Sequence, residues 1–174
     1  MSFKSVSSLL LLSVLFSVLS ACSKPNTDSQ IGNSKIGDSH QEAAILEVYK
    51  HPSCGCCGKW IDHLNSSGLT TGIHNSNSLA EFKQEKGIAP KYRSCHTAVS
   101  KDGYVFEGHI PAKFIQQFLN EKPEGAIGLS VPGMPLGSPG MEVGNKFSPY
   151  QVLQLNIDGS SSIYASINNA QEQY

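Results

Sequence analysis

Three of the five cysteines crowd into four residues of the chain, at Cys54, Cys56 and Cys57. Vicinal and C-x-C disulfides are strained, so this crowding is a poor disulfide framework and indicates metal or redox chemistry. The apolar run at residues 44–49 predicts a buried strand before the cysteines, and apolar residues at helical spacing over 57–64 predict a helix after them. At a helix N-terminus the unpaired N–H groups favour the thiolate, which is the form that binds metal.

Strand and helix signals alternate after this first helix. Residues 70–74 predict a second strand, and residues 78–81 predict a capping box that opens a second helix. Asp102 and Gly103 stand between two apolar runs and predict a hairpin, and Pro111 predicts the start of a third helix. This α/β order, β-α-β-α-β-β-α, resembles the thioredoxin-like fold, in which the first strand–helix loop carries redox or metal cysteines.

The last third of the chain predicts a loop followed by a closing hairpin. Residues 131–141 are rich in Gly, Pro and Met, a composition that excludes regular structure. The runs 152–157 and 163–167 flank Asp158 and Gly159, so they predict a C-terminal β-hairpin.

Cys95 and His96 are expected to join the three crowded cysteines. In a thioredoxin-like fold the segment that enters the third strand packs against the first-helix loop, and here this segment carries a thiol and an imidazole. A two-residue turn in the hairpin pairs position 101 with position 104 and sets His109 opposite His96, on the same face of the sheet. His109 is therefore a candidate ligand, or a partner of a ligand.

Met134 and Met141 both lie in the Gly/Pro-rich loop, where two methionines are unusual as core residues. Thioether and thiolate sulfur are soft ligands that select Cu(I), zinc or iron–sulfur centres over hard cations. Closely spaced thiolates bridge neighbouring ions, which favours a polynuclear Cu(I) cluster over a single tetrahedral zinc. The sequence leaves open whether one methionine instead caps the core. The candidate metal ligands are Cys54, Cys56, Cys57, Cys95, His96, His109, Met134 and Met141.

The remaining histidines are weaker candidates. His63 follows Cys57 by six positions, which places it far along the helix, so we expect it at the surface. His51 adjoins the cysteine loop and is within reach of it. His40 and His74 are expected to be ordinary polar positions.

The N-terminus predicts export and a lipid anchor. Lys4 precedes an apolar run at residues 9–19, the pattern of a signal peptide over residues 1–21. The sequence Leu-Ser-Ala-Cys that ends at Cys22 resembles the bacterial lipobox, whose cysteine is lipidated; an ordinary signal peptide with a chance cysteine is the alternative. We expect a protein anchored to a membrane of the cell envelope, facing the periplasm, with the outer membrane favoured.

The mature chain divides into a tether and one domain. Residues 22–43 are almost entirely polar and predict a flexible tether, and residues 44–174 have the length of a single metal-binding domain. The net charge is −1 and no basic run is present, which argues against nucleic acid as a partner.

Several motifs together look like the CopG-like family of bacterial envelope proteins, which is tied to copper resistance and long catalogued as a conserved domain of unknown function. The motifs are Val48-Tyr49-Lys50, Cys54 to Trp60, Arg93 to Ala98, Glu107 to Ala112 and Val131 to Met141. The resemblance implies a thioredoxin-like fold, periplasmic copper handling, and ligands at Cys54, Cys56, Cys57, Cys95 and His96. The lipobox is a departure, because many relatives look like soluble periplasmic proteins.

Three functions follow from these observations. The favoured one is a binding protein that sequesters Cu(I), passes it to a periplasmic copper-handling partner, or changes its redox state in copper resistance. The alternative is a periplasmic thiol–disulfide oxidoreductase that uses the C-x-x-C spacing of Cys54 and Cys57. A structural zinc module ranks third. No catalytic residue is assigned, and the sequence leaves copper or thiol redox activity open.

Overall fold

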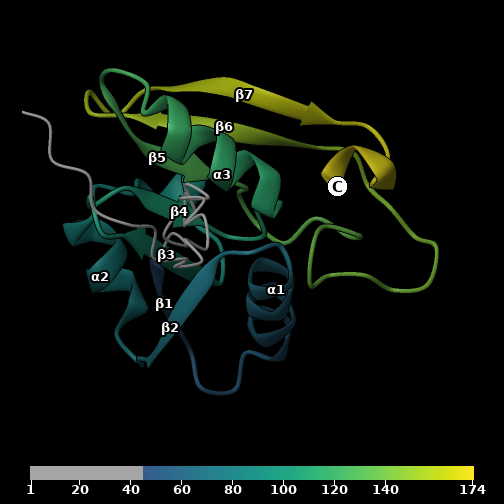
Figure 1. The fold of residues 1–174 in the computed structure, drawn as a ribbon. Helices are drawn as coiled ribbons and strands as arrows, with labels where there is room; N and C mark the ends of the chain where they lie inside the picture. The colour runs from purple at the N-terminus through teal and green to yellow at the C-terminus, as the bar shows by residue number, and fades with distance from the viewer. Residues whose placement is uncertain (1–44) are drawn as a thin grey trace, which may run out of the picture. The chain divides into compact units, whose positions relative to one another are not determined.

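The computed structural model describes residues 45–174 and gives them one mixed seven-stranded sheet with three helices (Figure 1). The strand order across the sheet is β2-β1-β3-β4-β5-β6-β7. The expected signal peptide, the lipidated Cys22 and the tether at 22–43 lie outside the described residues. Within residues 45–174, no helix is long and apolar enough to cross a membrane.

The first half of the domain follows the expected order of elements. They are β1 (Ile45–Lys50), α1 (Gly55–Ser66), β2 (Thr70–Asn75), α2 (Leu79–Glu85), β3 (His96–Ser100), β4 (Val105–Glu107) and α3 (Ala112–Glu121), with a 3₁₀ turn at Pro90–Tyr92. Strand β1 pairs in parallel with β2 and antiparallel with β3, which in turn pairs antiparallel with β4. The expected capping box is wrong: Ser78 occupies the N-cap of α2, but its side chain makes no capping hydrogen bond.

The second half extends the sheet by three strands. The hairpin of β6 (Tyr150–Asn156) and β7 (Ser161–Ile167) lies where the sequence predicts it, and a 3₁₀ turn at Ala170–Gln173 follows. Strand β5 (Ala126–Ser130) was not expected from the sequence; it pairs in parallel with β4 and antiparallel with β6. It therefore joins the predicted hairpin to the first four strands.

The sheet buries apolar side chains on both faces. Alternate residues of a strand point to opposite faces, so Phe106 of β4 belongs to the larger cluster and its neighbour Val105 to the smaller one. Helices α1 and α3 cover the larger cluster, to which they contribute Trp60, Ile61, Leu64, Ile115 and Phe118. Ile88 and Tyr92, which follow α2, belong to the smaller cluster.

The β3–β4 hairpin has a different register from the expected one. Val99 pairs with Val105, and the N–H of Ser100 donates to the carbonyl of Tyr104 at 2.9 Å, so the turn has three residues instead of two. Gly103 takes the left-handed conformation, with a φ of +89°, that such turns require. The residue opposite His96 is consequently Gly108, whose N–H donates to the His96 carbonyl at 3.0 Å.

Candidate metal centre

The three crowded cysteines lie at the N-terminus of α1. Cys54 is the N-cap residue, and Cys56 and Cys57 fall in the first turn. The turn before the helix is closed by a hydrogen bond from the Cys54 N–H to the His51 carbonyl, 3.0 Å long. Cys57 is fully buried, whereas Cys54 is half-buried, so this end of the helix presents sulfur between the core and solvent.

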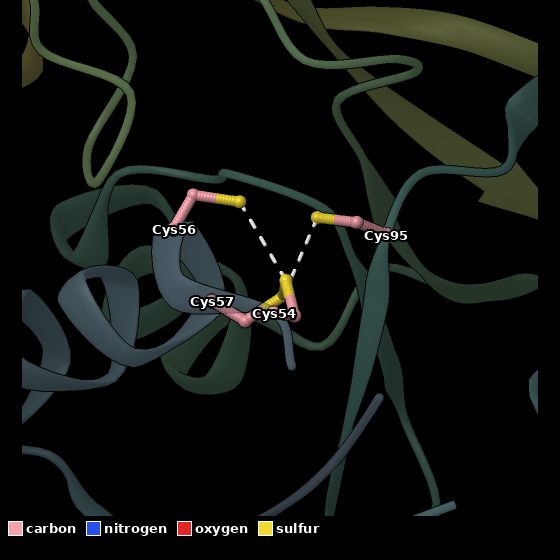
Figure 2. A group of neighbouring side chains, drawn as sticks. All are labelled: Cys54, Cys56, Cys57 and Cys95. Atoms are coloured by element: carbon pink, nitrogen blue, oxygen red, sulfur yellow. Dashed lines mark hydrogen bonds between the residues drawn. A yellow bond between two sulfur atoms is a disulfide. The ribbon is translucent and has the colours of Figure 1, made fainter. Parts of the chain in front are cut away.

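Cys95, just before β3, brings a fourth sulfur to the end of α1 (Figure 2). All four sulfur atoms lie within 4.8 Å of one another. Cys56 Sγ lies 3.5 Å from Cys54 Sγ, and Cys95 Sγ lies 3.6 Å from Cys57 Sγ. The fold therefore brings together the four cysteines that the sequence singles out.

Cys54 and Cys57 form a disulfide, which corrects the expectation that these cysteines are poorly placed for one. Residues three apart at a helix N-terminus lie about one turn apart, and here the two Cα atoms are separated by 5.4 Å, within the usual range for a disulfide. The strained vicinal and C-x-C pairings are avoided. Cys56 and Cys95 remain as free thiols in this state.

Two imidazoles face Cys95. His96 Nδ1 and His109 Nε2 each lie 3.2 Å from Cys95 Sγ, although the hairpin register does not set the two histidines opposite one another. His109 Nδ1 lies 2.8 Å from the Pro139 carbonyl. Because a carbonyl only accepts, Nδ1 carries the proton and the lone pair of Nε2 points at the sulfur. A hydrogen bond of this kind fixes the tautomer of histidines that bind metals.

Burial keeps the two imidazoles neutral. It sets the pKa of His96 well below its usual value, and repulsion from His109 when that ring is protonated, and from Lys83, lowers it further. Burial also lowers the pKa of His109, against a smaller opposing effect of the Pro139 carbonyl. His96 Nε2 is buried with no hydrogen-bond partner among the described residues. Both rings thus have the neutral form that metal coordination requires.

The Gly/Pro-rich loop packs over this group of side chains. The Gly133 carbonyl accepts a hydrogen bond from Ser94 Oγ, and the Pro139 carbonyl accepts one from His109. At Gly140 a Cβ atom would run into the Cys56 carbonyl and the backbone of Trp60, so this glycine lies directly against the first turns of α1. The loop contributes backbone at three points around the cysteines.

Similarity to known proteins agrees with this geometry. A family model described as a protein of unknown function, DUF411, matches residues 92–141. Two solved structures of copper resistance protein CopG, forms 1 and 2, are each 37% identical to this chain over 72% of its length. The matches cover 98% and 99% of those chains, with TM-scores of 0.68 and 0.69. The chain belongs to the CopG family. No curated protein matches it.

Both methionines of the loop lie within the residues that the DUF411 family model matches. Met134 is 54% exposed and Met141 is half-buried, and they are the neighbours in sequence of Gly133 and Gly140, which contact the site. The residue before each methionine therefore contacts a segment that carries a cysteine, Ser94 beside Cys95 in one case and the first turn of α1 in the other. Metal binding by the two thioethers stays a prediction.

The other histidines of residues 45–174 lie outside the sulfur group. His51 is exposed and bonds to Ser53 in its own loop, and His74 pairs with Glu47 at 2.5 Å. The expectation of a surface position for His63 is wrong: it is half-buried, and its Nε2 accepts a hydrogen bond from the Ala112 N–H at 3.0 Å. His40 is outside the described residues.

Two buried charges next to Cys95 escaped the sequence analysis. Lys83 is 3% exposed and Glu107 is fully buried, and they form an ion pair that also bonds to Ser94, the residue before Cys95. The available signal was a carboxylate at the end of the apolar sequence Val-Phe-Glu in β4. Nothing comparable marks Lys83, which lies in a short polar helix.

Proposed function

We propose that this protein binds Cu(I) in copper resistance and holds it, as a thiolate-bridged cluster, between the N-terminus of α1 and the start of β3. The observation that carries the proposal is the convergence of four cysteine sulfurs within 4.8 Å. The proposed ligands are Cys54, Cys56, Cys57 and Cys95, with His96, His109, Met134 and Met141 as further donors.

The donor set favours copper among the soft metals. Sulfur and neutral imidazole suit Cu(I), and sulfurs this close together are able to bridge several ions. Zinc also accepts four thiolates, but a structural zinc site uses one closed tetrahedral set, whereas here two imidazoles lie beside the fourth sulfur. The structural relatives carry the name copper resistance protein, which supports the same choice.

The disulfide state and the copper state exclude each other. A disulfide between Cys54 and Cys57 removes two of the four thiolates, so the proposed cluster needs the reduced protein. The same pair of cysteines is the basis of the alternative, a thiol–disulfide oxidoreductase. Copper titration and disulfide exchange therefore have to be compared on one preparation.

The remaining parts of the proposal concern fold type and location. The order β2-β1-β3-β4, with a parallel first pair and antiparallel later pairs, supports a thioredoxin-like arrangement for the first half of the sheet. We place the protein in the bacterial envelope, facing the periplasm, because of the signal-peptide pattern at residues 1–21 and the lipobox ending at Cys22. Lipid anchoring at Cys22 would hold it to a membrane, and periplasmic copper-handling proteins would be its partners.

An anaerobic Cu(I) titration of the reduced protein against a competing chelator tests the function, with bound metal counted by elemental analysis. Several copper ions per chain are expected, with strong losses in Cys56→Ser and Cys95→Ser. Ser66→Ala is the control, because Ser66 is exposed at the C-terminal end of α1, at the opposite end of the helix from the cysteines. The proposal is overturned if Cu(I) is not retained while Cys54 and Cys57 exchange readily with a model disulfide.

A further inference from the structure

A buried ion pair contacts the residues that flank Cys95 and His96 in the chain. Lys83 extends from α2 and Glu107 ends β4, and the two side chains are 4% and 0% exposed. Neither residue belongs to the proposed copper ligands. Charged side chains are rarely this buried unless they are paired, so the pair needs an explanation of its own.

The pair holds both backbone polar groups of Ser94. Glu107 Oε1 accepts hydrogen bonds from Lys83 Nζ and from the Ser94 N–H, the latter at 2.5 Å. Lys83 Nζ also donates to the Ser94 carbonyl at 3.0 Å. Ser94, the residue immediately before Cys95, thus donates a hydrogen bond to the carboxylate through its N–H and accepts one from the ammonium group through its carbonyl.

The second carboxylate oxygen of Glu107 binds the residue that follows Cys95 and His96 in the chain. Glu107 Oε2 accepts a hydrogen bond of 2.5 Å from Thr97 Oγ1, and Thr97 is fully buried. Cys95 and His96 therefore lie between two residues, Ser94 and Thr97, that are tied to one carboxylate. Charge-assisted hydrogen bonds are stronger and shorter than neutral ones, which suits them to fixing a backbone position.

Stability alone is a poor explanation for this arrangement. The cost of removing two charges from water offsets most of their attraction, so apolar residues of similar volume are often as stabilising as a buried ion pair. A buried pair does supply directional bonds that an apolar contact lacks. Here those bonds end on the residues that flank Cys95 and His96.

We propose that Lys83 and Glu107 are positioning residues of the copper centre, which clamp Ser94 and Thr97 and so set where Cys95 and His96 meet the cysteines of α1. This inference rests on the proposed copper function.

The test replaces both charges at once, with Lys83→Met and Glu107→Gln in one protein. Removing a single partner would leave an uncompensated buried charge, whereas the double change keeps the side-chain volumes and leaves none. The double variant is expected to fold but to bind Cu(I) about 10- to 100-fold more weakly, the usual effect of losing a group that orients a metal ligand. The ultraviolet absorption and emission of the copper-thiolate centre should change as well, which a loss of stability alone would not produce.

Two controls accompany this variant. The exposed pair of Lys122 and Asp102 is matched in chemistry, so Lys122→Met with Asp102→Asn should leave copper affinity and spectra unchanged. Ser130→Ala removes a buried hydroxyl, bonded to the Tyr92 carbonyl, that has no bond to Ser94 or Thr97. It should likewise leave the copper spectra as they are.

Each outcome separates this inference from the proposed function. Wild-type protein that fails to retain Cu(I) overturns both. Wild-type binding that the double variant reproduces in affinity and spectrum overturns the positioning role alone, as does an equal loss in the exposed control pair. If circular dichroism shows the double variant to be unfolded, Thr97→Val tests the positioning role instead. This change removes one hydrogen bond to Glu107 and leaves the ion pair with Lys83 in place. Unchanged copper affinity and spectra in Thr97→Val would then overturn the inference.

Discussion

At the scale of single residues, Cys95 connects the cysteines of α1 with the two imidazoles. Its sulfur lies next to Cys57, His96 and His109. Burial, followed by the nearby Cys56, raises the pKa of the Cys95 thiol to about 11. The thiol is therefore protonated at neutral pH in the metal-free protein, and under the proposed function it loses this proton when copper binds.

Copper affinity is expected to increase with pH. Between about pH 6 and about pH 8, each proton that leaves on binding strengthens the apparent affinity about tenfold per pH unit. Competition titrations across this range measure the slope, and proton release in weakly buffered solution gives an independent count. Cys95→Ser should reduce the number of protons released. A pH-independent affinity in the reduced wild type would contradict a protonated Cys95.

At the scale of elements, α1 both carries the cysteines and holds the segment that carries His109. Trp60 Nε1 donates to the Ile110 carbonyl at 2.8 Å, and three residues further along the helix His63 Nε2 accepts from the Ala112 N–H. Residues three apart lie on one side of a helix, so the two bonds act as a pair. They tie residues 110–112 to α1 directly after His109.

Because His63 accepts a hydrogen bond from the Ala112 N–H, we expect the free energy of unfolding to fall in acid. Burial lowers the pKa of His63 below 6.5, against a smaller opposing effect of Glu142, so its stabilising contribution is complete above about pH 6.5. Below that pH the unfolded chain takes up the proton first, and the contribution is lost progressively towards the lowered pKa of the folded protein. Urea unfolding of the metal-free protein at about pH 7 and about pH 5 measures this loss.

His63→Gln isolates the contribution of this histidine. The glutamine oxygen is able to accept the Ala112 N–H without titrating, so the variant should lose less stability than wild type on acidification. His96 and His109, whose pKa values are also lowered, titrate in both proteins and cancel in the comparison. His51→Gln, at an exposed position, serves as the control. Equal acid sensitivity of wild type and His63→Gln would rule out this role.

The contact between the Gly/Pro-rich loop and α1 makes a second prediction at this scale. Gly140 has a φ of +85° and leaves no room for a Cβ, because the Cys56 carbonyl and the Trp60 backbone occupy that space. Gly140→Ala should therefore lower the free energy of unfolding by about 1–3 kcal/mol and weaken copper binding as the loop moves away from α1. Urea unfolding and copper competition measure the two effects.

Gly144→Ala is the matched control for this change. Gly144 also has a positive φ, of +56°, but a Cβ there meets nothing within 4 Å. It therefore reports the backbone strain of alanine without the steric clash. Similar losses of stability and copper affinity in both variants would show that the loop contact does not matter for the centre.

At the scale of the whole molecule, the candidate ligands come from separate elements and converge on one place, so under the proposed function copper should stabilise the fold. A ligand that binds only the folded state at a free concentration 100 times its Kd stabilises by about 2.7 kcal/mol. Thermal unfolding of the reduced protein should shift to higher temperature with Cu(I). The protein with the Cys54–Cys57 disulfide should respond much less, since two thiolates are missing. Equal shifts of the unfolding temperature in the reduced and the disulfide forms would show that copper binds without the thiolates of Cys54 and Cys57.

Local signals predicted much of this molecule. The strand, cysteine loop and helix at 45–66 and the C-terminal hairpin follow from short-range apolar patterns and turn residues, and both are found where expected. Strand β5 was missed because it is short, contains Gly128 and has a register irregularity between Ala126 and Gly128. Such a strand is defined by its two neighbours in the sheet and hardly by its own sequence.

The gathering of the four cysteines with His96 and His109 could be predicted from the sequence, whereas the residues that hold them in place could not. Clustered cysteines and the Cys95–His96 pair are visible in the sequence because their chemistry is unusual. The hairpin register depended on whether Gly103 ends a three-residue turn, which the sequence does not decide. Lys83 and Glu107 are exceptions to the general rule that charged side chains lie at the surface. Their burial and their pairing therefore could not be predicted from the sequence.

The residues of the candidate site are spread along the chain, so the complete set of donors is present only late in synthesis. A ribosome delivers the α1 thiols first, the fourth sulfur and both imidazoles some forty to fifty-five positions later, and the covering backbone at 133–140 later still. No early fragment contains the full set of donors. Under the proposed function, a chain that binds copper through all of these donors has therefore been synthesised past residue 140 and has folded.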